Sequence, residues 1–215
     1  DLIEWLDEII ATPLVEAGSI SADRFCLADI GMDKKLRESE FYFPMDEANI
    51  SELTKLLTDH RNAAMLDPND AYGINHVRLP SYQTLKGMMH GFIDLVFEYN
   101  GKYYVCDYKS SHLGDNFTDY NHQALRHNIE KNYYDLQYLI YSLALHRYLQ
   151  QNIPDYDAEL HFGGSYYLYL RGMSNDEQYH GAGVYFRKVL PSELSALDCL
   201  FLGKTQGKNS LAEEK

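Results

Sequence analysis

Long apolar runs and paired cysteines are both missing from this sequence. No run of about 18 apolar residues occurs, which is the length that a membrane-spanning helix requires. Nothing has the pattern of a secretory signal. The three cysteines, Cys26, Cys106 and Cys199, are far apart and form no C-x-x-C pair. This odd, scattered set argues against a disulfide framework, a structural zinc or an iron–sulfur cluster, and we expect a reducing, cytoplasmic location.

Basic residues are also scarce. The chain has 19 Lys and Arg against 32 Asp and Glu, a net charge of −13. Proteins that bind nucleic acid usually carry a basic surface. Charge alone therefore favours a protein that does not bind DNA. The alternative is a domain that acts on a strand delivered by a more basic partner.

The length is typical of one domain. With 215 residues, 45% of them hydrophobic, the chain can bury one sizeable core, so we expect a single domain over residues 1–215. The sequence begins with Asp1 rather than methionine. We therefore expect a fragment of a longer protein, with a flexible tail after about residue 203.

Hydrophobic periodicity and turn residues predict a mixed α/β domain. We expect helices at 1–14, from Asn49 onward, at 121–150 and at 191–202. Strands are expected within 25–45 and at 91–99, 102–109, 164–171 and 182–188. Residues 67–70 have the composition of a loop, and Gly163-Gly164 that of a turn.

The strongest local signal is a β-hairpin around Asn100-Gly101, a dipeptide that suits a type I′ turn. A two-residue loop fixes the register, which makes Asp94 face Asp107 in a non-hydrogen-bonded pair with α-carbons about 4.5 Å apart. Period-two alternation puts Lys109 on the same face. The opposite face is predicted to be core and carries Ile93, Leu95, Phe97 and Cys106.

Two carboxylates and a lysine on one sheet face suggest metal chemistry on a phosphate. Like charges opposed on a sheet destabilise it by about 0.2–1 kcal/mol, so a cation between Asp94 and Asp107 would explain their presence. Mg²⁺ binds to one or two carboxylates, water and phosphate oxygens, and can activate a bound water. Lys109 could orient that water or neutralise charge on the phosphate. Alternatively, the two acids are solvated and Lys109 is their counter-ion.

These residues carry a family resemblance. The segments G-F-I-D (91–94) and D-Y-K (107–109) resemble the core of the PD-(D/E)xK nuclease superfamily. Y-D-L-Q-Y-L-I-Y (134–141) resembles the Q-x-x-x-Y element of its RecB-type branch. Shorter stretches at 108–115, 146–149, 161–164 and 170–172 are similar to the same branch, so the resemblance covers about residues 85 to 172.

The resemblance implies a restriction-endonuclease-like core, a central mixed sheet flanked by helices. It also implies a Mg²⁺-dependent DNA nuclease that degrades single strands as a partner helicase unwinds DNA. The implied partners are DNA, RecC- and RecD-like subunits and RecA. It further implies roles for individual residues. Asp94 and Asp107 would bind the metal with the backbone carbonyl of Tyr108, Lys109 would be the catalytic lysine, and Gln137 and Tyr141 would contact the DNA strand.

One element of the family pattern is not found. The RecB-type pattern also uses a metal-binding histidine, and none of the nine histidines here has a matching context. We expect the segment that carries it to be missing, which would weaken metal binding. Glu40 and Glu47 are candidates for an accessory acid, although each also fits an ordinary surface glutamate. The acidic charge and the missing histidine favour a rival hypothesis, a nuclease-fold module that docks RecA or another recombination protein.

Overall fold

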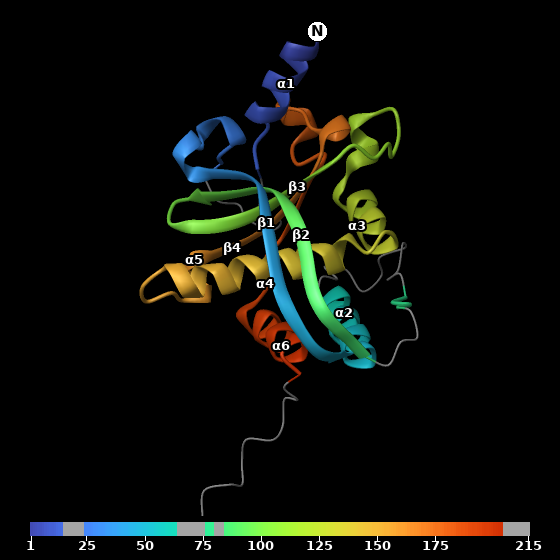
Figure 1. Cartoon of the computed structure of the whole chain (residues 1–215). Coiled ribbons are helices and arrows are strands. Elements are labelled where there is room, and N and C mark those ends of the chain that lie inside the picture. Colours follow the sequence, from blue (N-terminus) through green and yellow to red (C-terminus); the bar gives the residue numbers. More distant parts are fainter. Residues whose placement is uncertain (15–23, 64–75, 80–83, 204–215) are drawn as a thin grey trace, which may run out of the picture.

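The computed structural model describes residues 1–14, 24–63, 76–79 and 84–203 (Figure 1). The predicted loop at 67–70 and the predicted tail after residue 203 lie outside these ranges. The helices are α1 (Leu2–Ala11), α2 (Ile50–Ala63), α3 (His122–Lys131), α4 (Tyr134–Asn152), α5 (Ala158–His161) and α6 (Pro191–Phe201). The strands are β1 (Lys35–Asn49), β2 (Thr84–Tyr99), β3 (Lys102–Lys109), β4 (Phe162–Tyr169) and β5 (Val184–Arg187). No helix in the described part of the chain is long and apolar enough to cross a membrane.

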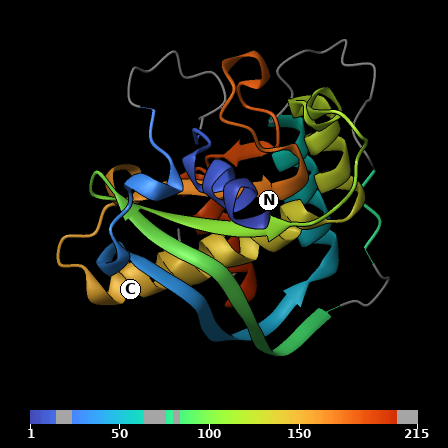
Figure 2. The ribbon, with the colours of Figure 1, turned by 90° about the horizontal axis from the view of Figure 1, so that it is seen from above.

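The strands form one five-stranded sheet in the order β1-β2-β3-β4-β5, and helices flank it, as expected. Only β3 and β4 run parallel; the other neighbours are antiparallel. Parallel neighbours need a crossover connection, and residues 110–161 supply it with α3, α4 and α5. This crossover lays α4 across one face of the sheet (Figures 1 and 2).

Each face of the sheet has its own hydrophobic core. On the α4 side, buried residues of β3 and β4 such as Val105 and Tyr167 pack with Leu139 and Leu143 of α4. On the other side, Cys106 and neighbouring residues pack with α1 and the segment around Leu27. A sheet buried on both faces leaves few positions for charged side chains, so a buried acid in it needs a specific partner.

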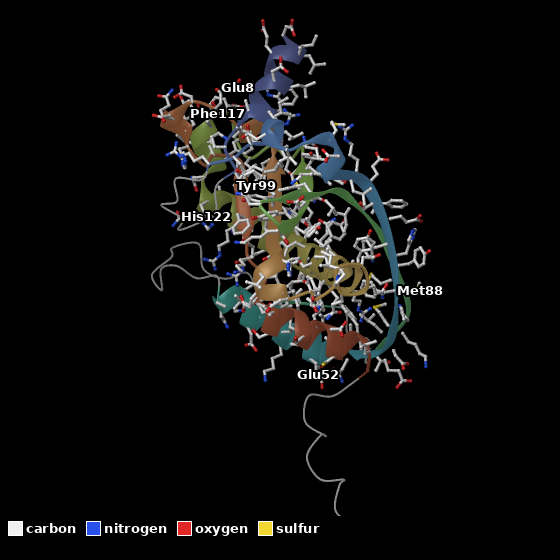
Figure 3. All side chains as sticks on the ribbon, turned by 90° about the vertical axis from the view of Figure 1, so that its left-hand side faces the viewer. Glu8, Glu52, Met88, Tyr99, Phe117 and His122 are labelled. Carbon is white, nitrogen blue, oxygen red and sulfur yellow. The ribbon has the colours of Figure 1, made fainter. Side chains whose placement is uncertain are left out.

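β1 and β2 continue beyond the rest of the sheet as a long curved two-stranded ribbon. Figure 3 shows the ribbon bowing outward, with Met88 on its outer side. Its inner side holds aromatic residues: the Phe41 ring meets the Tyr141 ring edge-on at 5.6 Å, and the Phe43 ring lies 5.9 Å from that of Phe201. The ribbon therefore wraps around α4 and α6 through apolar contacts.

The predicted hairpin turn is confirmed. Asn100 and Gly101 both have positive φ, 50° and 77°, as a type I′ turn requires. The predicted register holds from the turn to the Leu95–Cys106 pair, with no bulge between β2 and β3. The predicted first strand of the hairpin was too short, because β2 begins at Thr84 rather than at residue 91.

The predicted helix at 121–150 is in fact two helices. α3 ends at Lys131, Tyr133 takes a left-handed conformation with φ of 56°, and α4 begins at Tyr134. Arg61 of α2 lies at this break, where its guanidinium donates to the Glu130 carbonyl at 2.9 Å and binds the Asp135 carboxylate. The break therefore depends on a residue that is distant in sequence, which explains why local periodicity did not predict it.

Gly163 and Gly164 were predicted to form a turn but lie in strand β4. A Cβ on Gly163 would come within 2.3 Å of the Tyr104 ring, so close packing against β3 excludes a side chain there. Gly164 has φ of 140° next to the register shift between β3 and β4. These glycines are therefore required for the packing and pairing of β4. A Gly-Gly pair looks the same in the sequence whether it lies in a strand or in a turn.

We expect Gly101→Ala to lower the free energy of unfolding by about 1 kcal/mol, because an alanine at φ of 77° is strained. No atom lies within 4 Å of the added Cβ, so the loss comes from the backbone alone. Urea denaturation would measure it. The neighbouring exposed Lys102→Ala is the control, with an expected change within about 0.5 kcal/mol. Equal stabilities of the two variants would contradict the turn assignment.

Candidate active site

β2 and β3 separate at Asp94. The hydrogen-bonded ladder ends at Leu95–Cys106, one pair before Asp94 and Asp107 would face each other. The Asp94 carboxylate instead accepts a hydrogen bond from the backbone N–H of Tyr108 at 2.9 Å. Asp94 thus contacts the residue that follows Asp107, at the point where the two strands part.

This separation also determines where the carbonyl of Tyr108 points. In the register of the hairpin, Tyr108 would lie opposite Ile93 and exchange both backbone hydrogen bonds with it. The Asp94 carboxylate takes the N–H instead. The carbonyl lies on the same side of the strand as the N–H, so it faces the opening between β2 and β3 next to Asp94.

Asp107 and Lys109 form a buried ion pair, with 4% and 9% of their surface exposed. The Lys109 Nζ lies 2.6 Å from an Asp107 carboxylate oxygen, which confirms that the two side chains share a face. The same ammonium lies 3.7 Å from the centre of the Tyr134 ring and 4.8 Å from that of Tyr167. Aromatic faces attract a cation, so Lys109 is held in one position from several sides.

Gln137 links Lys109 to the helix α4. Its Oε1 accepts hydrogen bonds from the Lys109 ammonium at 3.0 Å and from the Tyr167 hydroxyl at 2.9 Å. Its Nε2 donates to the Tyr141 hydroxyl at 2.9 Å. Gln137 and Tyr141, which helical spacing places on one face, therefore lie beside the lysine that the sequence singled out.

Tyr134 and Tyr167 belong to this cluster but were not predicted. Tyr167 lies in strand β4, and parallel pairing of β3 and β4 sets it beside Asp107. Tyr134 is the first residue of α4, three positions before Gln137. Their contacts with Lys109 depend on strand order and on the helix crossing, which local patterns do not give.

Burial and neighbouring charges shift the acidity of this cluster. Burial raises the pKa of Asp107; the ion pair with Lys109 opposes that rise, and the charge of Asp94 adds to it. Burial also raises the pKa of the Tyr141 hydroxyl, and the negative charges of Asp107 and Asp94 raise it further. Both carboxylates therefore act on the same small region of the protein.

The predicted assignment of β2 and β3 side chains to the two faces of the sheet is only partly correct. Leu95, Phe97 and Cys106 lie in the core on the α1 side, as expected. Ile93, expected with them, instead belongs to the core on the α4 side. The alternation is interrupted at Asp94, where pairing of β2 with β3 ends while pairing with β1 continues.

The two candidate accessory acids, Glu40 and Glu47, are surface residues of the ribbon. The Glu40 carboxylate lies 2.9 Å from the His90 ring, and both side chains are about half exposed. Glu47 lies 3.5 Å from the ammonium of Lys86. Among the described residues, neither lines the cavity of about 470 Å³ that contains Asp94.

Glu38, which the sequence did not single out, lies closer to the candidate site. The pairs on either side of it, Arg37–Leu95 and Ser39–Ile93, put Glu38 opposite Asp94 in the ladder between β1 and β2. Glu38, Asp94 and Tyr108 line the same cavity of about 470 Å³. Its φ of 49° departs from strand geometry, so strand alternation could not have placed it.

The donor atoms suit a hard divalent cation. Asp94 and Asp107 offer carboxylate oxygens and Tyr108 a carbonyl oxygen, the ligand types that Mg²⁺ prefers. Among the described residues no three His, Cys, Asp or Glu side chains are grouped to hold a metal, and all three cysteines are free. The oxygen atoms that a hard cation could use here are those of the two carboxylates and the backbone carbonyl.

Fold and site together define a class of protein. A mixed sheet flanked by helices, with Asp94 where β2 leaves β3 and Asp107 and Lys109 at the end of β3, is consistent with a PD-(D/E)xK-type core. No family model matches the chain.

Individual proteins are nevertheless similar to this chain in sequence. RecB, a subunit of the RecBCD enzyme, is 38% identical over 205 residues in Escherichia coli and 37% identical over 201 residues in Haemophilus influenzae. These matches cover 95% and 93% of this chain but only 16% and 15% of the relatives. RecB of Mycobacterium tuberculosis is 35% identical over 176 residues, 75% of this chain and 15% of its own length. The chain is therefore homologous to RecB over the small part of RecB that it spans.

We expect Gln137→Leu to lower the free energy of unfolding by about 1–3 kcal/mol, because the buried Lys109 ammonium and Tyr167 hydroxyl would lose their shared acceptor. Urea denaturation would measure the loss. Gln150→Leu, on an exposed position of the same helix, is the matched control. A Gln137 variant as stable as the control would show that Gln137 does not hold the cluster together.

Proposed function

We propose that this chain is a Mg²⁺-dependent nuclease that hydrolyses phosphodiester bonds, mainly in single-stranded DNA. Two observations support the proposal: the Asp94 carboxylate is bonded to the Tyr108 N–H where β2 leaves β3, and Asp107 at the same end of β3 forms a buried ion pair with Lys109. Relatives named as RecB support a nuclease of this family.

In this proposal Asp94, Asp107 and the Tyr108 carbonyl hold the metal. When bound, the ion supplies Lewis acidity toward a phosphate oxygen and acidifies a bound water. Lys109 donates hydrogen bonds to the charge that develops on the phosphate or orients the water. The ring of Tyr134 and the acceptor of Gln137 keep the ammonium in place.

The role of the α4 residues follows from their position. Gln137 and Tyr141 lie side by side next to Lys109. We propose that they contact the DNA strand as it crosses the site. The Tyr141 hydroxyl accepts from Gln137 and keeps its own proton, which it can donate to a phosphate oxygen.

The relatives are named as subunits of the RecBCD enzyme. We propose that this chain works in the cytoplasm within such an assembly, with RecC- and RecD-like subunits and with RecA. A net charge of −13 opposes capture of free DNA, which fits a strand that a helicase delivers to the site.

The direct test is cleavage of labelled single-stranded DNA in Mg²⁺ by the purified chain and by Asp107→Asn. We expect Asp107→Asn to reduce the rate at least about a hundredfold, because it removes a charged metal ligand and the partner of Lys109. Asp59→Asn, an exposed acid on α2, is the control and should cleave at the wild-type rate. Lack of cleavage by the folded wild-type chain would contradict the proposal and favour the docking module.

A second prediction concerns the accessory acid. Since Glu38 lies opposite Asp94 and lines the same cavity, we expect Glu38→Gln to raise the Mg²⁺ concentration for half-maximal cleavage about tenfold. Glu47→Gln, on the far part of the ribbon, is the control and should leave it unchanged. Titrating Mg²⁺ in the cleavage assay measures both. Equal requirements in the two variants would exclude Glu38 as an accessory acid.

A further inference from the structure

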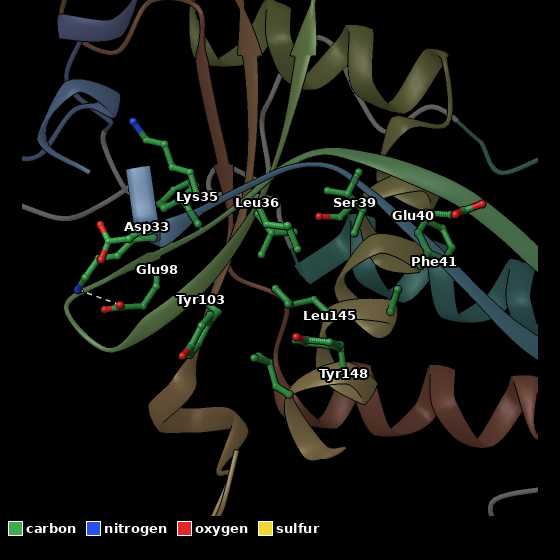
Figure 4. A pocket seen from close by; sticks show the side chains of 16 residues that line it. Asp33, Lys35, Leu36, Ser39, Glu40, Phe41, Glu98, Tyr103, Leu145 and Tyr148 are labelled. Carbon is green, nitrogen blue, oxygen red and sulfur yellow. Dashed lines mark ion pairs between the residues drawn. The ribbon is translucent and has the colours of Figure 1, made fainter. Parts of the chain in front are cut away.

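A second cavity lies between the β1–β2 ribbon and the C-terminal half of α4, and has a volume of about 430 Å³. Figure 4 shows Leu36, Ser39 and Phe41 of β1 on one side and Leu145 and Tyr148 of α4 on the other. The volume is within the range of about 300–1,000 Å³ that is typical of sites for small organic groups. It is therefore large enough for a planar ring.

Much of the wall of this cavity is apolar or aromatic. Phe41, Tyr103 and Tyr148 provide rings, and Leu145 and Val96 contribute aliphatic surface. Tyr148 is 57% exposed, so its ring is available to a molecule that enters from solvent. The charged side chains at this cavity include both signs, and one pair, Lys34 and Glu98, is joined at 2.8 Å. These walls favour an uncharged planar group over a phosphate.

One polar atom lacks a partner in this cavity. The hydroxyl of Ser39 is buried without a hydrogen bond in the described structure. Buried polar groups are nearly always hydrogen-bonded, so an unpartnered one needs an explanation. A hydroxyl can both donate and accept, which lets it pair with the edge of any nucleobase. An aliphatic side chain from a protein partner would leave it unpaired.

The cavity is connected to the candidate active site. Phe41, which lines the cavity, contacts the Tyr141 ring edge-on at 5.6 Å, and the Tyr141 hydroxyl bonds to Gln137 beside Lys109. Tyr148 follows Tyr141 by seven residues on α4, about two turns and about 10 Å along the helix. In a stacked strand this distance corresponds to about three nucleotides.

We propose that this cavity, bounded by Ser39, Phe41, Tyr103, Leu145 and Tyr148, binds one unstacked base of the single-stranded DNA, a few nucleotides from the bond that is cleaved. This rests on the proposed nuclease function. Stacking on aromatic rings tolerates any base, and the Ser39 hydroxyl adapts to each. The subsite therefore anchors the strand without sequence preference and without relying on the net charge of the chain, which is −13.

The test uses fluorescence anisotropy with labelled oligonucleotides of about 12 nucleotides, in which a single abasic position is moved along the strand. For the wild-type chain we expect one position at which loss of the base weakens binding about tenfold. Tyr148→Ala should weaken binding of the intact strand by a similar factor and abolish the effect of the abasic position. Tyr42→Ala is the matched control, because Tyr42 is 69% exposed and does not line the cavity.

Cleavage kinetics give a second readout. Tyr148→Ala should raise KM about tenfold and leave kcat unchanged, since Tyr148 lies away from Asp107 and Lys109. If Tyr148→Ala behaves like the wild type in both assays while Asp107→Asn abolishes cleavage, the base subsite is overturned and the nuclease proposal stands. The cavity would then suit a protein partner.

Binding without cleavage would separate the two proposals in the opposite way. If the wild-type chain binds the strand with the expected abasic dependence but does not cleave it, the subsite stands and the nuclease proposal fails. If it neither binds nor cleaves single-stranded DNA, both are overturned.

Discussion

The hydrogen bond from the Tyr108 N–H to the Asp94 carboxylate marks the feature on which the rest of the site depends, the separation of β2 from β3. If the ladder continued, Ile93 would take both backbone groups of Tyr108, and the sheet would close over this point. Instead β2 follows β1 into the curved ribbon. The separation leaves Asp94 and the Tyr108 carbonyl at an opening in the sheet, next to the buried Asp107.

α4 serves the core and the candidate site at once. One part of its surface packs in the main core through Leu139 and Leu143, and another carries Gln137 and Tyr141 to Lys109. The pair of Arg61 and Asp135, both nearly inaccessible to solvent, holds the first turn of the helix. Removal of one partner of such a pair would leave a buried charge, so the start of α4 is strongly constrained.

The net negative charge of the chain affects how a DNA strand could reach the candidate site. Lys109 is neutralised by Asp107 and covered by aromatic rings, so it adds little to the field outside the protein. The cavity beside β1 is lined mainly by uncharged surface. A strand that binds here would gain contacts from rings and hydrogen bonds at short range. Long-range attraction would have to come from elsewhere, because a chain of net charge −13 repels polyanions.

The sequence by itself determined the local parts of this protein. Asn100-Gly101 fixes a tight turn and hence the register of β2 with β3, and two-residue spacing puts Asp107 and Lys109 on one face. Helical spacing does the same for Gln137 and Tyr141. Tertiary structure decided the contacts between residues that are far apart in the chain. These are the contact of Arg61 at the break before α4, and the positions of Tyr167 and Glu38 beside the site. Those positions follow from strand order, curvature and packing, which depend on the whole chain and leave no local pattern.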